Sequence, residues 1–284
     1  MSRSHLSILD LRAYAIGRYA DLRHDPATLL PGARAIICCA FSYAQPAFAP
    51  GGLPAISAYA LGEDYHITLR RRLAPLAARL EEAGAQTRIC VDSAPLHERY
   101  LAARAGLGTV TLNGALSLPL HGSKVFLAEI LTTAPISPQK ASFEATDPFS
   151  CADCGLCARA CPTQAITEAG IDASRCLSAI TIEHRGPHTP AQRALLAEAA
   201  RRGKAIPLYG CDLCRDVCPR NRSPLTPALP EFAVSEAIAS FTPAALSEMS
   251  GGEFKRRFST SPLLRLGLRD LRRNLDSALA AKKY

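Results

Sequence analysis

The chain has 284 residues, of which 48% are hydrophobic and 20% charged, a balance typical of folded globular proteins and unlike that of disordered or fibrous chains. No apolar run approaches the roughly 20 residues of a membrane-spanning helix, and charges interrupt the N-terminus, where a signal peptide would have an apolar core. These features predict a soluble cytoplasmic protein, whose eleven cysteines suit metal better than disulfides. The net charge of +8 suits nucleic-acid binding, although many basic proteins bind none.

The first half of the chain alternates between strand and helix patterns. Apolar runs over 33–43, 87–94 and 124–133 predict strands, and helical periodicity over 66–84 and 97–108 predicts helices. Pro75 predicts a kink or a break in the first of these helices. The alternation indicates a layered α/β (α+β) domain, to which we assign residues 1–145.

A change in composition near residue 134 marks a linker rich in Pro and Ser. Cysteines dominate residues 151–218, and helical patterns resume from about residue 230. We therefore expect a ferredoxin-like domain at 146–229 and a short helical segment at 230–284 that packs on the core.

The cysteine spacing is the most specific signal in the chain. The first run, Cys-x2-Cys-x2-Cys-x3-Cys-Pro, is the bacterial ferredoxin pattern, in which three cysteines bind one [4Fe–4S] cluster and the fourth binds the other. The second run, Cys-x2-Cys-x3-Cys-Pro, is one ligand short, and Cys176 between the runs can supply it. The spacing assigns Cys151, Cys154, Cys157 and Cys218 to cluster 1 and Cys161, Cys176, Cys211 and Cys214 to cluster 2.

Zinc is the main alternative, because paired cysteines also make zinc sites, but zinc sites rarely carry a third cysteine two residues on or the CxxxCP ending. Cys38, Cys39 and Cys90 lie in predicted strands, and we expect them in the core. Two clusters imply transfer of single electrons without naming a substrate, so the chemistry must belong to the α/β domain.

Several segments together resemble the epoxyqueuosine reductase family, the cobalamin-dependent iron–sulfur enzymes of tRNA queuosine synthesis. The most specific is CLSAITIEHRG followed by YGCDLCRDVCP, which is not ordinary ferredoxin sequence. The resemblance runs in the family's order over nearly the whole chain, with further segments at 22–36, 55–66, 91–108, 122–132 and 253–274. It identifies the chain as a short member of that family or a close paralogue.

The resemblance implies that the α/β domain holds cobalamin against the ferredoxin-like domain, with the nearer cluster beside the corrin. Reduced cobalt would open the epoxide of epoxyqueuosine in a tRNA anticodon loop, and two electrons and two protons would leave an alkene and water. The expected partners are tRNA and an external low-potential electron donor, and we expect a monomer.

The family's proton donor falls on Asp92, with Tyr65 and His66 as further candidates for the substrate pocket. A carboxyl at the end of a buried strand, near an apolar corrin, would have a raised pKa and could act as an acid near neutral pH. The residues alone also allow Asp92 to be the N-cap of the following helix and His66 to be an ordinary histidine with satisfied partners.

The cofactor contacts that the resemblance implies, several of them through the backbone, fall on Arg23, Ile56, Asp92, Leu116, Leu127, Ser178 and Arg185. The basic segments 253–257 and 265–274 suit contacts with the tRNA backbone, because phosphate neutralisation dominates such binding. The alternative is a solvated helix face, which is the commoner meaning of such charge runs.

The chain departs from the family pattern in three places. Thr109–Leu112 replaces Trp-Ile-Gly-Lys in a segment expected to line the pocket, Arg220 replaces a Trp, and the chain is short at both ends. These departures leave two alternatives open. One is a related cobalamin/iron–sulfur reductase of a small molecule. The other is a non-enzymatic electron carrier, which Asp92 and the α/β motifs disfavour.

Overall fold

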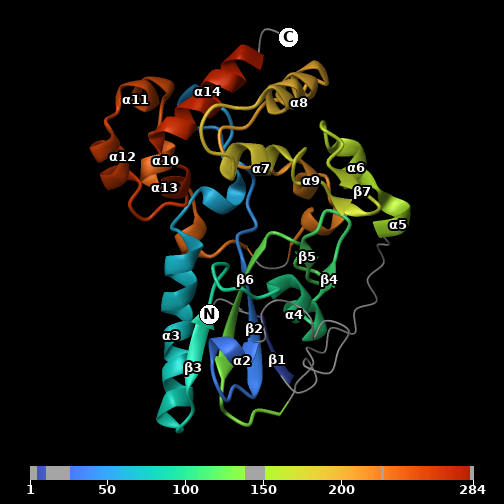
Figure 1. Cartoon of the computed structure of the whole chain (residues 1–284), viewed down its shortest axis with the longest axis vertical. Helices are drawn as coiled ribbons and strands as arrows, with labels where there is room; N and C mark the ends of the chain where they lie inside the picture. The colour runs from blue at the N-terminus through green and yellow to red at the C-terminus, as the bar shows by residue number, and fades with distance from the viewer. Residues whose placement is uncertain (1–4, 11–25, 138–150, 225–226, 282–284) are drawn as a thin grey trace.

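The computed structural model describes residues 5–10, 26–137, 151–224 and 227–281. A four-stranded sheet forms the lower part of the molecule, and short helices gather above it (Figure 1). The sheet order is β1-β2-β6-β3, and every neighbouring pair is antiparallel. Its strands are β1 His5–Asp10, β2 Ala35–Ser42, β3 Thr87–Cys90 and β6 Val125–Thr132. The three predicted strands are confirmed.

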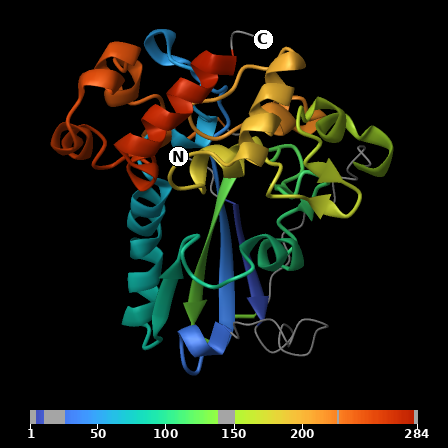
Figure 2. The same ribbon diagram turned by 45° about the horizontal axis from the view of Figure 1, so that its top comes forward.

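Alternate residues of the central strands face opposite sides of the sheet. β2 is buried along its whole length, which explains its continuous apolar sequence. One face packs against α3 (Tyr65–Glu82) through Ile37 and Cys39, and the other packs against α4 (Glu98–Arg104) through Cys38. Two views show α3 as a long helix beside β3 (Figures 1 and 2). The two predicted helices are confirmed.

Three details refine the sequence-based predictions. The described sheet is antiparallel throughout, which makes this part of the chain α+β. α3 is not broken at Pro75, since one helix runs through that position. The cysteines expected in the core, Cys38, Cys39 and Cys90, are buried there.

Short elements carry the cysteine motifs in the upper part of the molecule. Helix α6 packs on α9, which brings the two cysteine runs together. The elements are α5 Cys151–Cys154, α6 Leu156–Ala160, β7 Ile166–Thr167, β8 Gly170–Ile171, α7 Leu177–Ile182, α8 Pro190–Arg201, α9 Leu213–Asp216 and η3 Pro219–Asn221. Small elements of the first half are α2 Pro26–Leu29, η1 Pro50–Gly52, η2 Ala58–Ala60, β4 Thr109–Val110 and β5 Leu116–Ser117.

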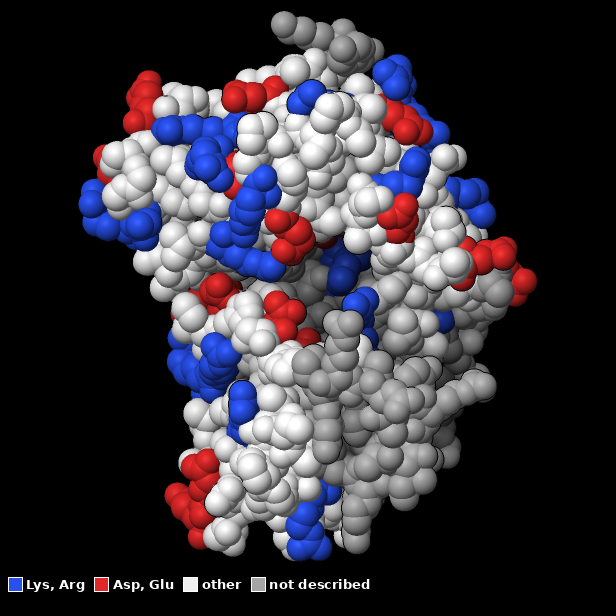
Figure 3. Space-filling model, in the orientation of Figure 1, with Lys and Arg blue, Asp and Glu red and all other residues white. Residues whose placement is uncertain are grey.

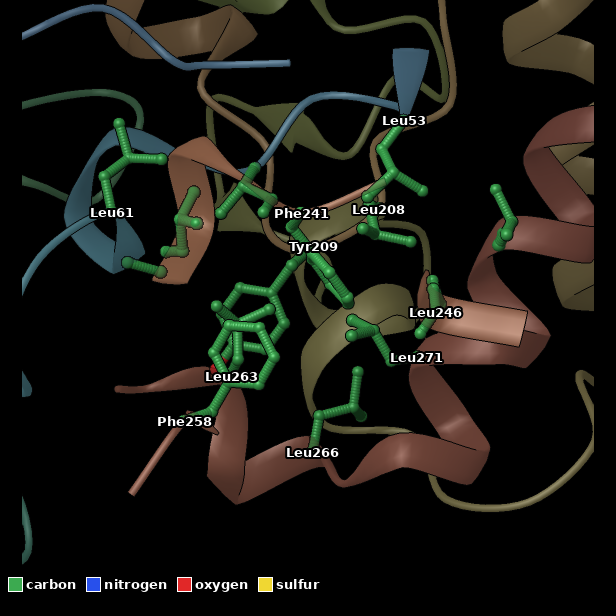
Figure 4. Close-up of a cluster of buried hydrophobic side chains, with 14 of the residues drawn as sticks. Leu53, Leu61, Leu208, Tyr209, Phe241, Leu246, Phe258, Leu263, Leu266 and Leu271 are labelled. Carbon is green, nitrogen blue, oxygen red and sulfur yellow. The ribbon is translucent and has the colours of Figure 1, made fainter. Parts of the chain in front are cut away.

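The C-terminal helices share a hydrophobic core with earlier parts of the chain. Figure 4 shows Phe241, Phe258 and Leu271 packed around Leu208 and Tyr209. The elements are η4 Pro230–Phe232, α10 Glu236–Ala239, α11 Pro243–Glu248, α12 Gly251–Arg257, α13 Leu263–Leu266 and α14 Leu268–Ala281. The domain boundaries themselves stay predictions. Among the described helices, none is both long and apolar enough to cross a membrane.

Candidate redox site

The eight cysteines of the two motifs gather into two groups. The outer group, as we name it, lines a single cavity and consists of Cys151, Cys154, Cys157 and Cys218. Gly155 turns the chain between α5 and α6 in a left-handed conformation, with φ of 52°. Pro219, after the last of these cysteines, begins η3. The grouping is the one predicted for cluster 1.

The inner group, as we name it, consists of the cysteines predicted for cluster 2, which are Cys161, Cys176, Cys211 and Cys214. The Cys214 thiol is electrostatically coupled to Cys176 and Cys161, and also to Cys157 of the outer group, so the two groups adjoin one another. Burial raises the pKa of Cys211 and of Cys214 to about 12, so thiolates at these positions need a bound cation to balance their charge. Iron supplies that charge, and the donor set therefore fits a cluster.

A cleft of about 430 Å³ lies between the sheet and the cysteine-bearing region. Figure 3 shows the molecule hollowed across its middle, with acidic and basic side chains around the hollow. Apolar residues of β6 and polar residues of other segments share the cleft wall, a mixture typical of ligand sites. The lining residues that matter below are Tyr65, Asp92, Glu98, Leu127, Ser178, Cys211, Asp212, Arg215 and Arg265.

The two cysteine groups differ in their relation to this cleft. Cys211 of the inner group lines the cleft, whereas Thr111, Leu112 and Asn113 line the cavity of the outer group. The side-chain amide of Asn113 also donates to the Cys214 carbonyl at 3.2 Å. The inner group therefore meets the cleft, and the outer group lies behind it.

The structure places the altered segment Thr109–Leu112 away from the predicted position. None of its residues is among the described residues that line the cleft, so the expectation that it lines the substrate pocket is wrong. Thr109 and Val110 are exposed on β4, while Thr111 and Leu112 cover the outer cysteines. Arg220, the second departure from the family pattern, lines the same outer cavity.

Asp92 lies in the turn after β3 with φ of 51°, a conformation uncommon outside glycine. Its Oδ2 accepts a hydrogen bond from the Tyr65 hydroxyl at 2.6 Å and lies 3.6 Å from Nε2 of His66. Its backbone N–H donates to Oε1 of Glu98 at 2.5 Å. The N-cap alternative is wrong, because the N-cap of α4 is His97. The three pocket residues predicted from the resemblance thus meet at one point.

The acidic proton at this point belongs to His66 rather than to Asp92. Asp64 accepts from the backbone N–H of His66 and pairs with its Nδ1 at 2.8 Å. Asp64, with Asp92 on the other side, raises the pKa of His66 to about 9. The contact with His66, and then that with Tyr65, holds the pKa of Asp92 below its usual range despite partial burial. The predicted rise in the Asp92 pKa is therefore wrong.

Two charged residues of the second cysteine run shape the cleft wall, and the sequence analysis does not single them out. Asp212 is buried and accepts the Ser57 hydroxyl and the Ala58 backbone N–H, both at 2.6 Å. Arg215 donates to the hydroxyl of Tyr43, whose ring also lines the cleft. The available signal is that each of them directly follows a cysteine of the inner group, because a charge held in the interior needs a partner.

The residues predicted to contact the cofactor are only partly brought together. Leu127 and Ser178 line the cleft with Asp92. Ile56 and Leu116 are buried in hydrophobic clusters. Arg185 donates hydrogen bonds to two backbone carbonyls at 3.0 and 2.9 Å. None of these three is among the described residues that line the cleft. Arg23 lies outside the described residues.

Several arginines of the two basic segments are engaged within the protein, while other basic side chains of these segments are exposed. Arg257, Arg272 and Arg273 each donate to backbone carbonyls of neighbouring segments. Arg265 pairs with Glu183 at 2.6 Å, and both line the cleft. These contacts stabilise the fold, and the tRNA contact stays a prediction for the exposed basic residues of the two segments.

The chain matches two family models. Residues 23–93 match the model described as Epoxyqueuosine reductase QueG, DUF1730, and residues 150–221 match the 4Fe-4S double cluster binding domain. The second match decides between clusters and zinc, in favour of two [4Fe–4S] clusters.

Similar proteins and structures extend this likeness to most of the chain. The epoxyqueuosine reductase of Gloeobacter violaceus is 39% identical over 270 residues, covering 91% of this chain and 80% of that protein. That of Synechocystis sp. is 33% identical, covering 93% and 92%. An epoxyqueuosine reductase crystallised with an epoxyqueuosine-modified tRNA-Tyr stem loop has a TM-score of 0.81 at 28% identity, covering 98% of this chain and 78% of that one.

A Bacillus subtilis epoxyqueuosine reductase, solved with its catalytic aspartate loop swung out of the active site, has a TM-score of 0.79 at 27% identity, covering 99% and 78%. The matched sequence and the matched fold both extend through the cleft and the two cysteine groups. The chain belongs to the epoxyqueuosine reductase family.

Proposed function

We propose that this protein reduces epoxyqueuosine to queuosine in a tRNA anticodon loop, using cobalamin reduced through its two [4Fe–4S] clusters. One observation carries the proposal: a single cleft joins Cys211 of the inner group to Asp92. Loss of an epoxide oxygen as water needs two electrons and two protons, so the electron path and the proton donor must meet. The names of the relatives supply the substrate.

The residues of the cleft fit cobalamin. Val125, Phe126 and Leu127 of β6 form an apolar wall suited to a corrin, and Ser178 at the start of α7 offers a polar contact near Cys211. Cobalamin bound there would pass electrons from the inner cluster to the substrate. The protein's part is to hold the cofactor and the substrate together and to provide protons.

His66, Asp92 and Tyr65 form the proton-delivery group. His66 carries a proton at neutral pH, because its pKa is raised to about 9. Asp92 is half exposed toward the cleft and lies between His66 and the Tyr65 hydroxyl. A proton held by this group can therefore reach an oxygen atom in the cleft through Asp92.

We place the reaction in the cytoplasm, on tRNA, with the protein acting as a monomer. The net charge of +8 favours a polyanionic substrate. An external low-potential donor would deliver electrons at the outer cluster, since the inner one faces the cleft. The small-molecule alternative is motivated by the altered segment Thr109–Leu112 and by the short ends of the chain. The segment covers the outer cysteines, which weakens the first of these two arguments.

The test is direct reduction of a defined RNA. Anaerobically reconstituted protein with cobalamin and a low-potential reductant is incubated with an epoxyqueuosine-modified anticodon stem loop, and the nucleosides are separated by mass. We expect epoxyqueuosine to disappear and queuosine to form, with activity that falls steeply as salt rises. Unchanged epoxyqueuosine in the presence of intact clusters and bound cobalamin would refute the function.

A further inference from the structure

A buried carboxyl group lies in the centre of the sheet. Glu129 on β6 is fully buried, and neither of its carboxyl oxygens has a hydrogen-bond partner among the described residues. The strand register sets it opposite Cys38 of β2 and Cys90 of β3. Burial, and then Glu98, raises the pKa of Glu129 well above its usual range, because an ionised carboxylate in this apolar position would be uncompensated.

Glu98 links this buried group to the cleft. It is the first residue of α4, which packs on the sheet face that holds Cys38. Its side chain lines the cleft, and its Oε1 accepts the backbone N–H of Asp92 at 2.5 Å. The Glu98 and Glu129 carboxyls are electrostatically coupled. Glu98 thus stands between the core acid and the loop of the proton-delivery group.

The ionisable groups around the pair leave Glu98 poised to hold or release a proton. Burial, with a smaller contribution from the charge of Asp92, raises the pKa of Glu98 to about 7, while the Asp92 N–H, Glu129 and His66 oppose the rise. Cys38 and Cys90 lie beside Glu129 on the same face of the sheet, and burial raises the pKa of each thiol. They remain neutral at neutral pH.

The proposed reaction needs more protons than the first group holds. The epoxide carbon–oxygen bonds both break, two electrons form the carbon–carbon double bond, and the oxygen leaves as water with two protons. His66 and Asp92 together hold one proton at neutral pH, since Asp92 is the ionised partner. Burial raises the pKa of Tyr65, so its hydroxyl keeps its proton. A second acid that faces the same cleft would supply the other proton.

We propose that Glu98 is the second proton donor, and that Glu129 is a positioning residue that hydrogen-bonds the Glu98 carboxylate after its proton has gone. The inference rests on the proposed function for its substrate. Each turnover takes one proton from the His66–Asp92 group and one from Glu98, and bulk water restores both through the open cleft. Glu129 keeps its own proton throughout.

The decisive variant is Glu98→Gln. The amide oxygen still accepts the Asp92 N–H, so the loop keeps its place, but the side chain has no acidic proton. We expect turnover to fall on the order of 10²-fold or more. In the native protein, turnover should fall as pH rises through about 7, the Glu98 pKa, and this alkaline limb should vanish in the variant. Iron content and the cobalamin spectrum should not change.

Glu129 is tested by two replacements with different chemistry. Glu129→Gln keeps a hydrogen-bond donor for the Glu98 carboxylate and should retain most of the activity. Glu129→Leu removes the donor, so the Glu98 pKa should rise, the alkaline limb should move to higher pH, and turnover should fall. Glu81→Gln, an exposed position near the far end of α3, is the matched control with native turnover expected.

A readout without turnover keeps this inference separate from the proposed function. Infrared spectra of the reconstituted protein between pH 6 and pH 8 should show a carboxylic-acid stretching band that titrates near pH 7 and is absent in Glu98→Gln. Native turnover and an unchanged pH profile in Glu98→Gln would overturn the inference, as would lost turnover with the alkaline limb and the band intact. If native protein leaves the modified RNA unreduced, the function fails, and the band alone decides whether Glu98 holds a proton.

Discussion

The two cysteine groups are built from the same motif but lie in different surroundings. The inner group meets the cleft at Cys211, and the charged Asp212 and Arg215 brace that wall. The outer group is covered by the segment that includes Leu112 and by Arg220, the two places where internal sequence departs from the family pattern. Both internal departures therefore lie at the outer group, which is the end of the proposed path where electrons would enter.

The largest expected effect is on turnover, and it should differ between the inner and the outer cluster. Cys214→Ser removes an inner ligand and should abolish turnover. Cys154→Ser removes an outer ligand, so protein reduced beforehand should still complete a single turnover while repeated turnover falls. Iron analysis, EPR spectra and single-turnover product counts would check this. Equal loss of the single turnover in both variants would contradict the inner and outer assignment.

A smaller loss of turnover is expected when residues of the proton-delivery group are replaced and both clusters stay intact. Asp92→Asn should lower turnover by roughly 10²- to 10⁴-fold, because positioned proton transfer contributes about that much. Tyr65→Phe removes one hydrogen bond to Asp92 and should cost less. Rates are compared at equal iron and cobalamin content. Full activity in Asp92→Asn would remove Asp92 from the mechanism.

The stability of the folded protein should depend on pH through His66, which lies beside the cleft residue Asp92. The raised pKa of His66, about 9, means that its ion pairs contribute fully below the unfolded-state value of about 6.5 and are lost as pH rises through about 9. Partial exposure limits the contribution to about 1–2 kcal/mol. Native protein should thus lose more Tm than His66→Gln between pH 6.5 and pH 9 under anaerobic conditions. Parallel curves for the two proteins would show that the His66 pKa is not raised.

The smallest effect is expected where the sequence departs most. Leu112→Ala opens the cover of the outer group, so that cluster should be lost faster in air. The KM for the modified stem loop should stay at its native value, because Leu112 is not among the described residues that line the cleft. Absorbance decay and steady-state kinetics measure the two quantities. A raised KM would return this segment to the substrate pocket.

Sequence reasoning succeeded where the determining contacts are local. The cysteine spacings of two and three residues predict two [4Fe–4S] clusters, which the match to the double cluster domain confirms, and the helix over 66–84 follows from its periodicity. Burial of Cys38 and Cys90 follows from the apolar strands around them.

It failed where the chain brings distant residues together. The pKa of Asp92 depends on His66 and Tyr65, which α3 presents from 26 and 27 positions earlier. The coupling of Glu98 with Glu129 depends on the register of β6 and on how α4 packs over it, neither of which leaves a sequence pattern. The misplaced segment Thr109–Leu112 shows that a departure from a family pattern marks a difference without locating it.

The two hydrogen bonds that Asp212 accepts have a consequence for how the protein acquires its cofactors in the cell. Asp212 follows an inner ligand directly, and its carboxylate fixes the Ser57 hydroxyl and the Ala58 amide across the cleft. Iron that anchors Cys211 therefore also sets the wall against which the second cofactor must fit. We expect the clusters to be inserted first and cobalamin to bind second. Iron starvation would then leave a protein that cannot retain cobalamin.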